Sequence, residues 1–80
     1  MEYSIGRDRN GNRVLRVKPR HGRGFSIQTL GNLWQTHREG VGDWTKDEVA
    51  DHVQSYGTNR QRLMMAAFTV ADKADNGGAL

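Results

Sequence analysis

The side chains able to do acid–base or metal chemistry are few and widely spaced in this chain. Histidines stand at positions 21, 37 and 52, and cysteine is absent. Local metal motifs place their ligands within one helical turn or one tight loop of each other, and these histidines do not. No pairing of a nucleophile with a base can be identified either. The sequence therefore predicts no catalytic residues, no metal, no cofactor and no enzymatic activity.

Carboxylates gather where a helix is expected to begin. Acids in the first turn of a helix are stabilised by its dipole, so a solvated helix face is the simplest interpretation of this group. A second interpretation is a secondary acidic patch that contacts a basic partner. Its members are Asp43, Asp47, Glu48 and Asp51.

A run of basic residues between positions 7 and 23 is the strongest chemical feature of the sequence. Only Asp8 opposes seven cations in this stretch. Arginine predominates among them, and its planar guanidinium suits bidentate contact with phosphate or carboxylate. We expect a partner-binding surface made of Arg7, Arg9, Arg13, Arg16, Lys18, Arg20 and Arg23. The alternative is a solubilising sheet face that also protects an edge strand.

The charge is unevenly divided along the chain. Residues 1–40 carry a net +5 and residues 41–80 a net −2, which together give +3. Such asymmetry suggests an anionic partner, either a polyanion or an acidic protein surface. Trp34 follows the basic run. Core packing is the default role of a tryptophan in so short a chain, but an exposed Trp34 would add a binding anchor or a stacking platform to the expected surface.

Three strands are expected to carry the basic run. Residues 2–8 and 13–18 alternate between apolar and polar side chains, and Asn10-Gly11 between them is typical of a hairpin turn. A basic, glycine-rich loop at 19–24 precedes a third alternating stretch at 25–30. Gly31-Asn32 indicates a turn, and no further strand is predicted in residues 33–43.

The second half of the sequence has helical periodicity. Thr45 and Glu48 form a capping box, Val49, Val53 and Tyr56 share one face, and Gly57 is the expected stop. A second capping box at Thr58–Gln61 opens a helix that is expected to run to about Ala74. Its predicted apolar face combines Leu63, Ala67, Val70 and Ala74, with Met64, Phe68 and Ala71 beside them.

These elements predict one α+β domain over residues 1–80, a two-layer sandwich of a three-stranded antiparallel sheet (β-β-β) packed against two C-terminal helices. The parts are a basic β-rich half at 1–44, two helices at 45–75 and a frayed tail at 76–80. The expected core consists of Ile5, Leu15, Val17, Phe25, Ile27, Val49, Val53, Leu63, Ala67 and Phe68. We expect a monomer or weak homodimer.

Composition also bears on location. A small secreted domain usually needs disulfides or a metal, so the absence of cysteine favours the reducing cytoplasm. No apolar stretch approaches the length of a membrane span, and the first residues lack the apolar segment of a signal peptide. We therefore expect a cytoplasmic protein without a membrane partner.

Residues 24–38, GFSIQTLGNLWQTHR, resemble a motif of short phage- and prophage-encoded proteins. The whole chain is similar to small anti-CRISPR proteins directed at type I surveillance complexes of the I-C kind. In that motif a proline often stands where this chain has Trp34. The resemblance implies a non-catalytic protein that binds protein subunits of the Cascade complex in the infected bacterial host and keeps target DNA from docking. The alternative is a small basic accessory protein that binds nucleic acid, because a basic sheet serves both functions.

Overall fold

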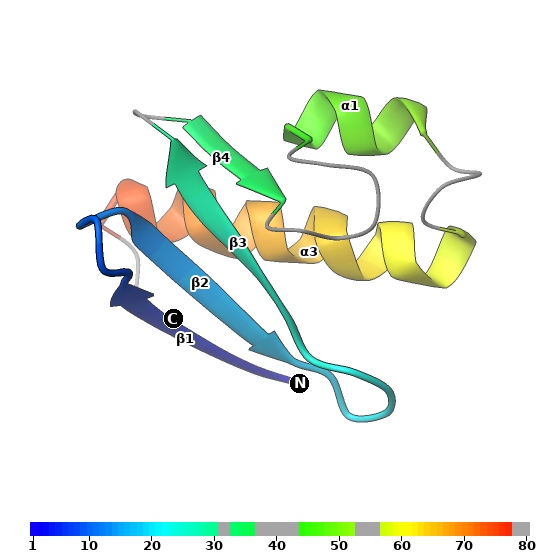
Figure 1. Cartoon of the computed structure of the whole chain (residues 1–80). Coiled ribbons are helices and arrows are strands. Elements are labelled where there is room, and N and C mark those ends of the chain that lie inside the picture. The colour runs from blue at the N-terminus through cyan, green and yellow to red at the C-terminus, as the bar shows by residue number, and fades with distance from the viewer. Residues whose placement is uncertain (31–32, 37–43, 53–56, 78–80) are drawn as a thin grey trace.

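The computed structural model describes residues 1–30, 33–36, 44–52 and 57–77. It consists of an antiparallel sheet packed against two helices, which confirms the predicted α+β class (Figure 1). The elements in chain order are β1 (Glu2–Arg7), β2 (Arg13–Lys18), β3 (Phe25–Leu30), β4 (Leu33–Thr36), α1 (Lys46–Asp51) and α3 (Thr58–Asp75).

The sheet has four strands in the order β1-β2-β3-β4, so the prediction of three strands was wrong by one. The additional strand, β4, pairs with β3 in a register that sets Leu30 opposite Leu33 and Thr29 opposite Trp34. Its four residues alternate between exposed or half-buried and buried side chains. So short a stretch, half of it polar, carries little apolar periodicity, which explains why the strand was missed.

The β1–β2 hairpin closes through five residues rather than a two-residue turn. Arg7 pairs with Arg13, so residues 8–12 form the connection. The Asp8 carboxylate accepts hydrogen bonds from the backbone N–H groups of Asn10 and Asn12, each at 2.8 Å. Gly11 has φ +84°, a conformation that glycine adopts without strain. The predicted turn is therefore in the right place, but Asp8 organises it.

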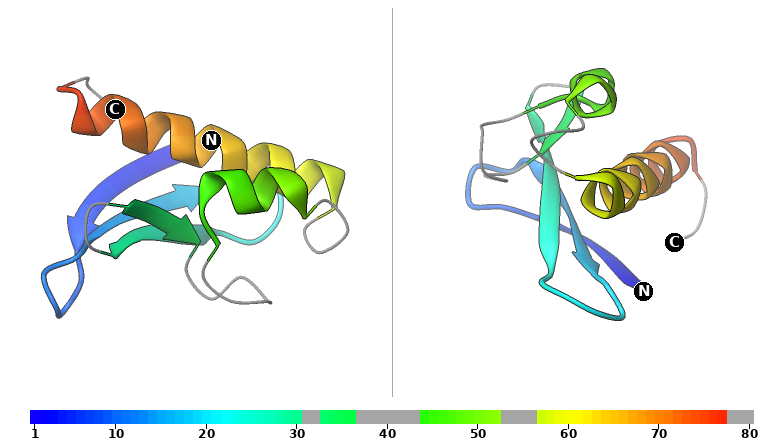
Figure 2. Two further views of the ribbon diagram at one scale, coloured as in Figure 1. Left: turned by 90° about the horizontal axis from the view of Figure 1, so that it is seen from above. Right: turned by 90° about the vertical axis from the view of Figure 1, so that its right-hand side faces the viewer.

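Strand pleating gives the sheet two unlike faces. The inner face lies against α3 and carries most of the apolar side chains, among them Leu15, Val17, Phe25, Ile27 and Trp34. The outer face carries mostly polar side chains, among them Ser4, Arg16, Lys18, Ser26 and Gln28. Figure 2 shows α3 on one side of the sheet, with the opposite side uncovered by either helix. Arg16 and Lys18 thus share the outer face, as predicted.

Helix α3 supplies the other half of the core. Its buried residues are Met64, Ala67, Phe68 and Ala71, which follow the i, i+3, i+4, i+7 spacing of one helix face. Leu63 and Val70 were placed at the centre of the apolar face but are only half-buried. The buried stripe is therefore rotated toward the Met64 side of the helix.

Helix α1 is capped as the sequence predicted and is shorter than expected. The Thr45 side chain accepts from the Glu48 N–H, and the Glu48 carboxylate accepts from the Thr45 N–H. The helix ends at Asp51 with His52 as its C-cap. The expected contacts of Val53 and Tyr56 lie outside the described residues.

The second predicted capping box was wrong. Gly57 is the N-cap of α3, with φ +73°, and no side chain caps this end. The Gln61 amide instead donates to the C=O groups of Val49 and Ala50, at 3.2 and 2.9 Å. It therefore ties α3 to two carbonyl groups near the end of α1, of which the Val49 C=O also accepts from the His52 N–H.

The C-terminal end of α3 agrees with the prediction. Asn76 is the C-cap and Gly77 follows with φ +84°, the usual conformation after a helix. Within the expected tail, residues 78–80 lie outside the described residues. So do Asp43 of the predicted acidic patch and the turn at 31–32.

Candidate partner-binding surface

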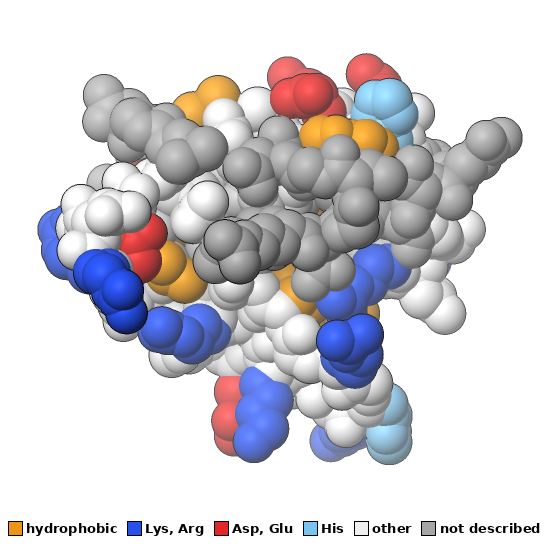
Figure 3. All heavy atoms as spheres, viewed as in Figure 1, with side chains coloured by type: hydrophobic (Ala, Val, Ile, Leu, Met, Phe, Trp, Pro, Cys, Tyr) orange, Lys and Arg blue, Asp and Glu red, His pale blue; other side chains and the backbone are white. Residues whose placement is uncertain are grey.

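The basic residues do not form one continuous patch. The β1–β2 turn and the β2–β3 loop lie at opposite ends of the sheet (Figure 1), and a six-residue strand separates them by about 20 Å. Figure 3 shows basic side chains at the left over the turn, at the lower right over the loop, and at separate places between them. The sequence placed them together only because they are close along the chain.

At the turn end, two of the three arginines make contacts within the protein. Arg7 donates to the C=O of Gly11 at 2.8 Å. Arg13 is half-buried, donates to the Asp75 carboxylate in a salt bridge, and lies over the ring of Trp34, 5.3 Å from its centroid. Arg9 is exposed. Most of the cationic character at this end is therefore used to hold the fold.

Trp34 is not an exposed anchor. Its side chain is 5% exposed and belongs to the core cluster, and its indole N–H donates to Asp75 at 2.8 Å. The reason is its register in β4, which directs it to the inner face beside α3. The expectation that Trp34 offers a hot spot or a base-stacking platform is corrected by this burial. Sequence reasoning missed Asp75, which joins Arg13 and Trp34.

At the loop end, two arginine side chains are not used in hydrogen bonds or ion pairs among the described residues. Arg20 and Arg23 are exposed, and neither side chain has a hydrogen bond or ion pair within the described part of the chain. Arg60 of α3 reaches the same loop, donating to the C=O of Arg23 at 3.3 Å and lying over the ring of Phe25 at 4.5 Å. The sequence did not identify Arg60 as a neighbour of this loop, because it lies 37 residues away along the chain.

The outer face adds two exposed cations between these ends. Arg16 and Lys18 project from it, Lys18 opposite Glu2 and Arg16 opposite Ser4. Lys18 is next to the β2–β3 loop, so it extends the loop-end cluster onto the sheet. We name Lys18, Arg20 and Arg23 the loop-end cluster.

The acidic residues are exposed, and one is already engaged. Asp47 and Glu48 lie in the first turn of α1, and Asp51 is its last residue. Glu48 completes the capping box with Thr45. Asp47 also borders a hollow of about 250 Å³ between β4, α1 and α3, where Asp72 and Asp75 lie nearby. Two of these acids were missed because they belong to the far end of α3.

The described residues contain no group of three or more histidine or carboxylate side chains placed to hold a metal ion. His21 and His52 are exposed, and the ring of His52 lies against Trp44 at a centroid distance of 4.0 Å. None of the helices in the described residues is long and apolar enough to cross a lipid bilayer. Comparisons with protein-family models, with curated proteins and with solved structures find no significant match to this chain.

Proposed function

We propose that this protein acts by stoichiometric binding, as a phage-type anti-CRISPR that attaches to a type I surveillance complex and keeps target DNA from docking. The observation that carries the binding surface is the loop-end cluster. The side chains of its three cations are exposed at one end of the sheet and form no hydrogen bond or ion pair with the residues that the structure describes. Cations held exposed and without partners favour an anionic partner surface. The nature of the complex is taken from the resemblance of the whole chain to small anti-CRISPR proteins directed at type I surveillance complexes.

An acidic protein surface suits this cluster better than a long duplex. A protein that follows DNA usually presents basic side chains along one continuous face. Here Arg7 and Arg13 of the turn end are occupied by internal contacts, so most of the exposed cations of the basic run lie at the loop end and on the outer face next to it. A compact cluster fits a confined acidic site on a protein subunit, where charge complementarity steers association and fixes orientation.

The test is a titration of a purified type I-C complex, loaded with its guide RNA, against a labelled target duplex. We expect the protein to abolish target binding at a molar ratio near its number of sites on the complex, whereas free duplex alone remains unbound at physiological salt. Binding of the free duplex with a steep salt dependence would instead favour the nucleic-acid-binding accessory protein. Target binding that is unchanged at saturating protein would contradict the proposal.

A further inference from the structure

The two edges of the sheet are closed to different extents. At the β4 edge, Gln35 bridges to Thr45, and Thr36 exchanges hydrogen bonds with Trp44 through its N–H and its hydroxyl oxygen, both at 2.8 Å. At the other edge, β1 pairs with β2 alone among the described residues. An edge strand without a partner presents a row of N–H and C=O groups to which another strand can bind.

The backbone groups at this edge can be assigned from the hairpin. The Asp8 N–H donates to the Asn12 C=O at 2.8 Å, so this pair is of the hydrogen-bonded kind. Bonded and non-bonded pairs alternate along an antiparallel ladder. The even-numbered residues of β1 therefore bond to β2, and the odd-numbered residues direct their N–H and C=O groups to the open edge. These are Tyr3, Ile5 and Arg7.

The side chains of β1 do little to protect the edge. Natural edge strands are commonly guarded by proline, lysine, a bulge or an inward-pointing charge. The sequence of β1, EYSIGR, has no proline and no lysine, and its only charges are at its two ends. On the inner face, Tyr3 and Ile5 are half-buried against the rim of the core. A second strand laid here would cover them further.

We propose that β1 of a second copy of this chain pairs antiparallel with β1, about a two-fold axis that passes beside Ser4. Tyr3 then exchanges two hydrogen bonds with Ile5 of the second copy, and Ile5 does the same with its Tyr3. Ser4 lies opposite Ser4 of the second copy in a non-bonded pair. The two sheets join into one of eight strands, and the inner faces stay on the same side.

Charge selects this register. A Cβ on Gly6 would lie 3.2 Å from Nη1 of Arg16, so the guanidinium rests over Gly6 on the outer face, toward the open edge. In the proposed register Glu2 of the second copy lies opposite Gly6 and next to this guanidinium, and symmetry repeats the contact. The next register, centred on Ile5, would set Glu2 opposite Asp8, and like charges facing each other destabilise a pair.

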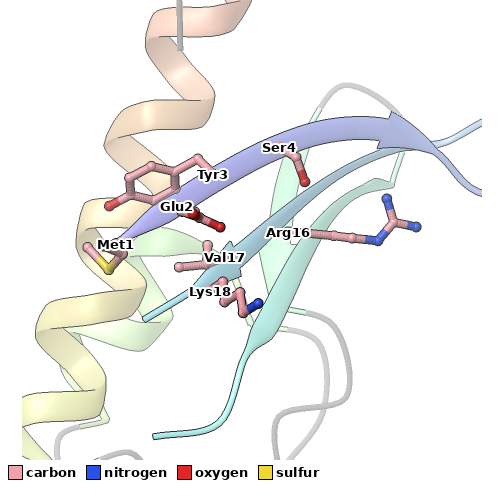
Figure 4. Close-up of a pocket in the computed structure, with 7 residues that line it drawn as sticks. All are labelled: Met1, Glu2, Tyr3, Ser4, Arg16, Val17 and Lys18. Atoms are coloured by element: carbon pink, nitrogen blue, oxygen red, sulfur yellow. The ribbon is translucent and has the colours of Figure 1, made fainter. Parts of the chain in front are cut away.

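The surface at the start of β1 is recessed. A hollow of about 630 Å³ borders the start of β1, lined by Met1–Ser4 and Arg16–Lys18 (Figure 4). In Figure 4, Ser4 and Arg16 point to the side of the sheet opposite to Tyr3. The proposed register runs residues 4–7 of the second copy alongside Met1–Ser4, the stretch of β1 that borders this hollow.

A single cysteine tests the register, because the chain has none of its own. In a non-bonded antiparallel pair the Cα atoms are about 4.5 Å apart, within the range that a disulfide spans. We expect Ser4→Cys to form a disulfide-linked dimer on mild oxidation. The matched controls are Asn59→Cys and Thr69→Cys, both exposed on α3 and outside the proposed interface. Both should cross-link at least about tenfold more slowly, since their sulfur atoms are held too far apart.

A charge exchange tests the same interface by another route. Glu2→Lys and Arg16→Glu should each raise the dimer dissociation constant roughly tenfold in sedimentation experiments, and the double variant should restore it. The Arg16 guanidinium reaches toward Gly6 and away from Glu2 of its own chain, so rescue reports the contact between copies. The proposal would be overturned if Ser4→Cys cross-links no faster than its controls, or if the double variant does not restore the dissociation constant. A wild-type protein that stays monomeric at every concentration would also overturn it.

Discussion

The two ends of β2 contain the same residue type in two different roles. At the turn end, Arg13 forms a salt bridge with Asp75 and stacks on Trp34, and Arg7 holds the Gly11 carbonyl. At the loop end, the exposed side chains of Arg20 and Arg23 form no hydrogen bond or ion pair in the described part of the chain. An arginine-rich sequence is thus divided by its fold into cations that stabilise the protein and cations that remain for a partner.

The cause of this division is what lies opposite each end of the sheet. The turn end faces the C-terminal end of α3, where Asp75 supplies an acceptor for both the Arg13 guanidinium and the Trp34 indole. The loop end faces the start of α3, where the neighbour is another cation, Arg60. Arg60 also lies over the Phe25 ring. The side chains of Arg20 and Arg23 form no ion pair within the described residues, so their positive charge remains available at the loop end.

Among the residues of the turn end, the largest loss of unfolding free energy should come from removing the Trp34 side chain. The side chain is 5% exposed within the core, so Trp34→Ala should cost about 3–5 kcal/mol of unfolding free energy. Trp34→Phe keeps much of the apolar volume and loses the indole N–H, so its cost should be smaller. Urea unfolding followed by circular dichroism measures both. A loss below about 1 kcal/mol for the alanine variant would show that the indole is not part of the core.

Removal of Asp75 should have the next largest effect. Asp75→Ala leaves the buried Trp34 N–H without an acceptor and Arg13 without its anion, for a loss of about 1–3 kcal/mol. Asp72→Ala is the matched control, because Asp72 is an exposed acid near the same negative end of the helix dipole.

Both aspartates interact unfavourably with the negative end of the helix dipole, and the control removes this shared effect. The difference in unfolding free energy between the two variants therefore measures the contacts of Asp75 with Trp34 and Arg13. Equal stability of the two variants would mean that Asp75 contributes no more than a surface charge, and the contrast between the two ends of the sheet would disappear.

Local sequence signals predicted much of the fold. The three longer strands follow from period-two alternation, and the α1 start follows from the Thr45–Glu48 box. These features depend on residues within a few positions of each other. The short β4 depends instead on its pairing with β3. The N-terminus of α3 has Gly57 as its N-cap rather than the capping box that the sequence of residues 58–61 suggested.

The candidate site was less predictable because it depends on distant residues. Arg13 and Asp75 are 62 positions apart, and Trp34 and Asp75 are 41 apart. No periodicity reports such contacts. The sequence therefore identified the arginines as a group, but not which of them the fold would occupy. It left Trp34 between core packing and an exposed anchor, and the register of β4 places it in the core.

The smallest effect on stability, and the one most informative about function, is expected from charge reversal in the loop-end cluster. Arg20→Glu with Arg23→Glu should change the unfolding free energy by no more than about 0.5 kcal/mol, because both side chains are exposed and make no internal contact. The same double variant should weaken binding to the type I complex by at least about tenfold, since it reverses two charges in a confined contact.

The control is Arg9→Glu with Lys73→Glu, which changes the net charge equally but places the reversals at the turn end and in the last turn of α3, where both side chains are exposed. Exposed charges farther apart than a Debye length, about 8 Å at physiological ionic strength, interact weakly, so this control should bind almost as the wild type does. Equal loss in both double variants would mean that net charge governs association. Loss confined to the loop-end variant would locate the contact at Arg20 and Arg23, the arginines that the fold itself does not use.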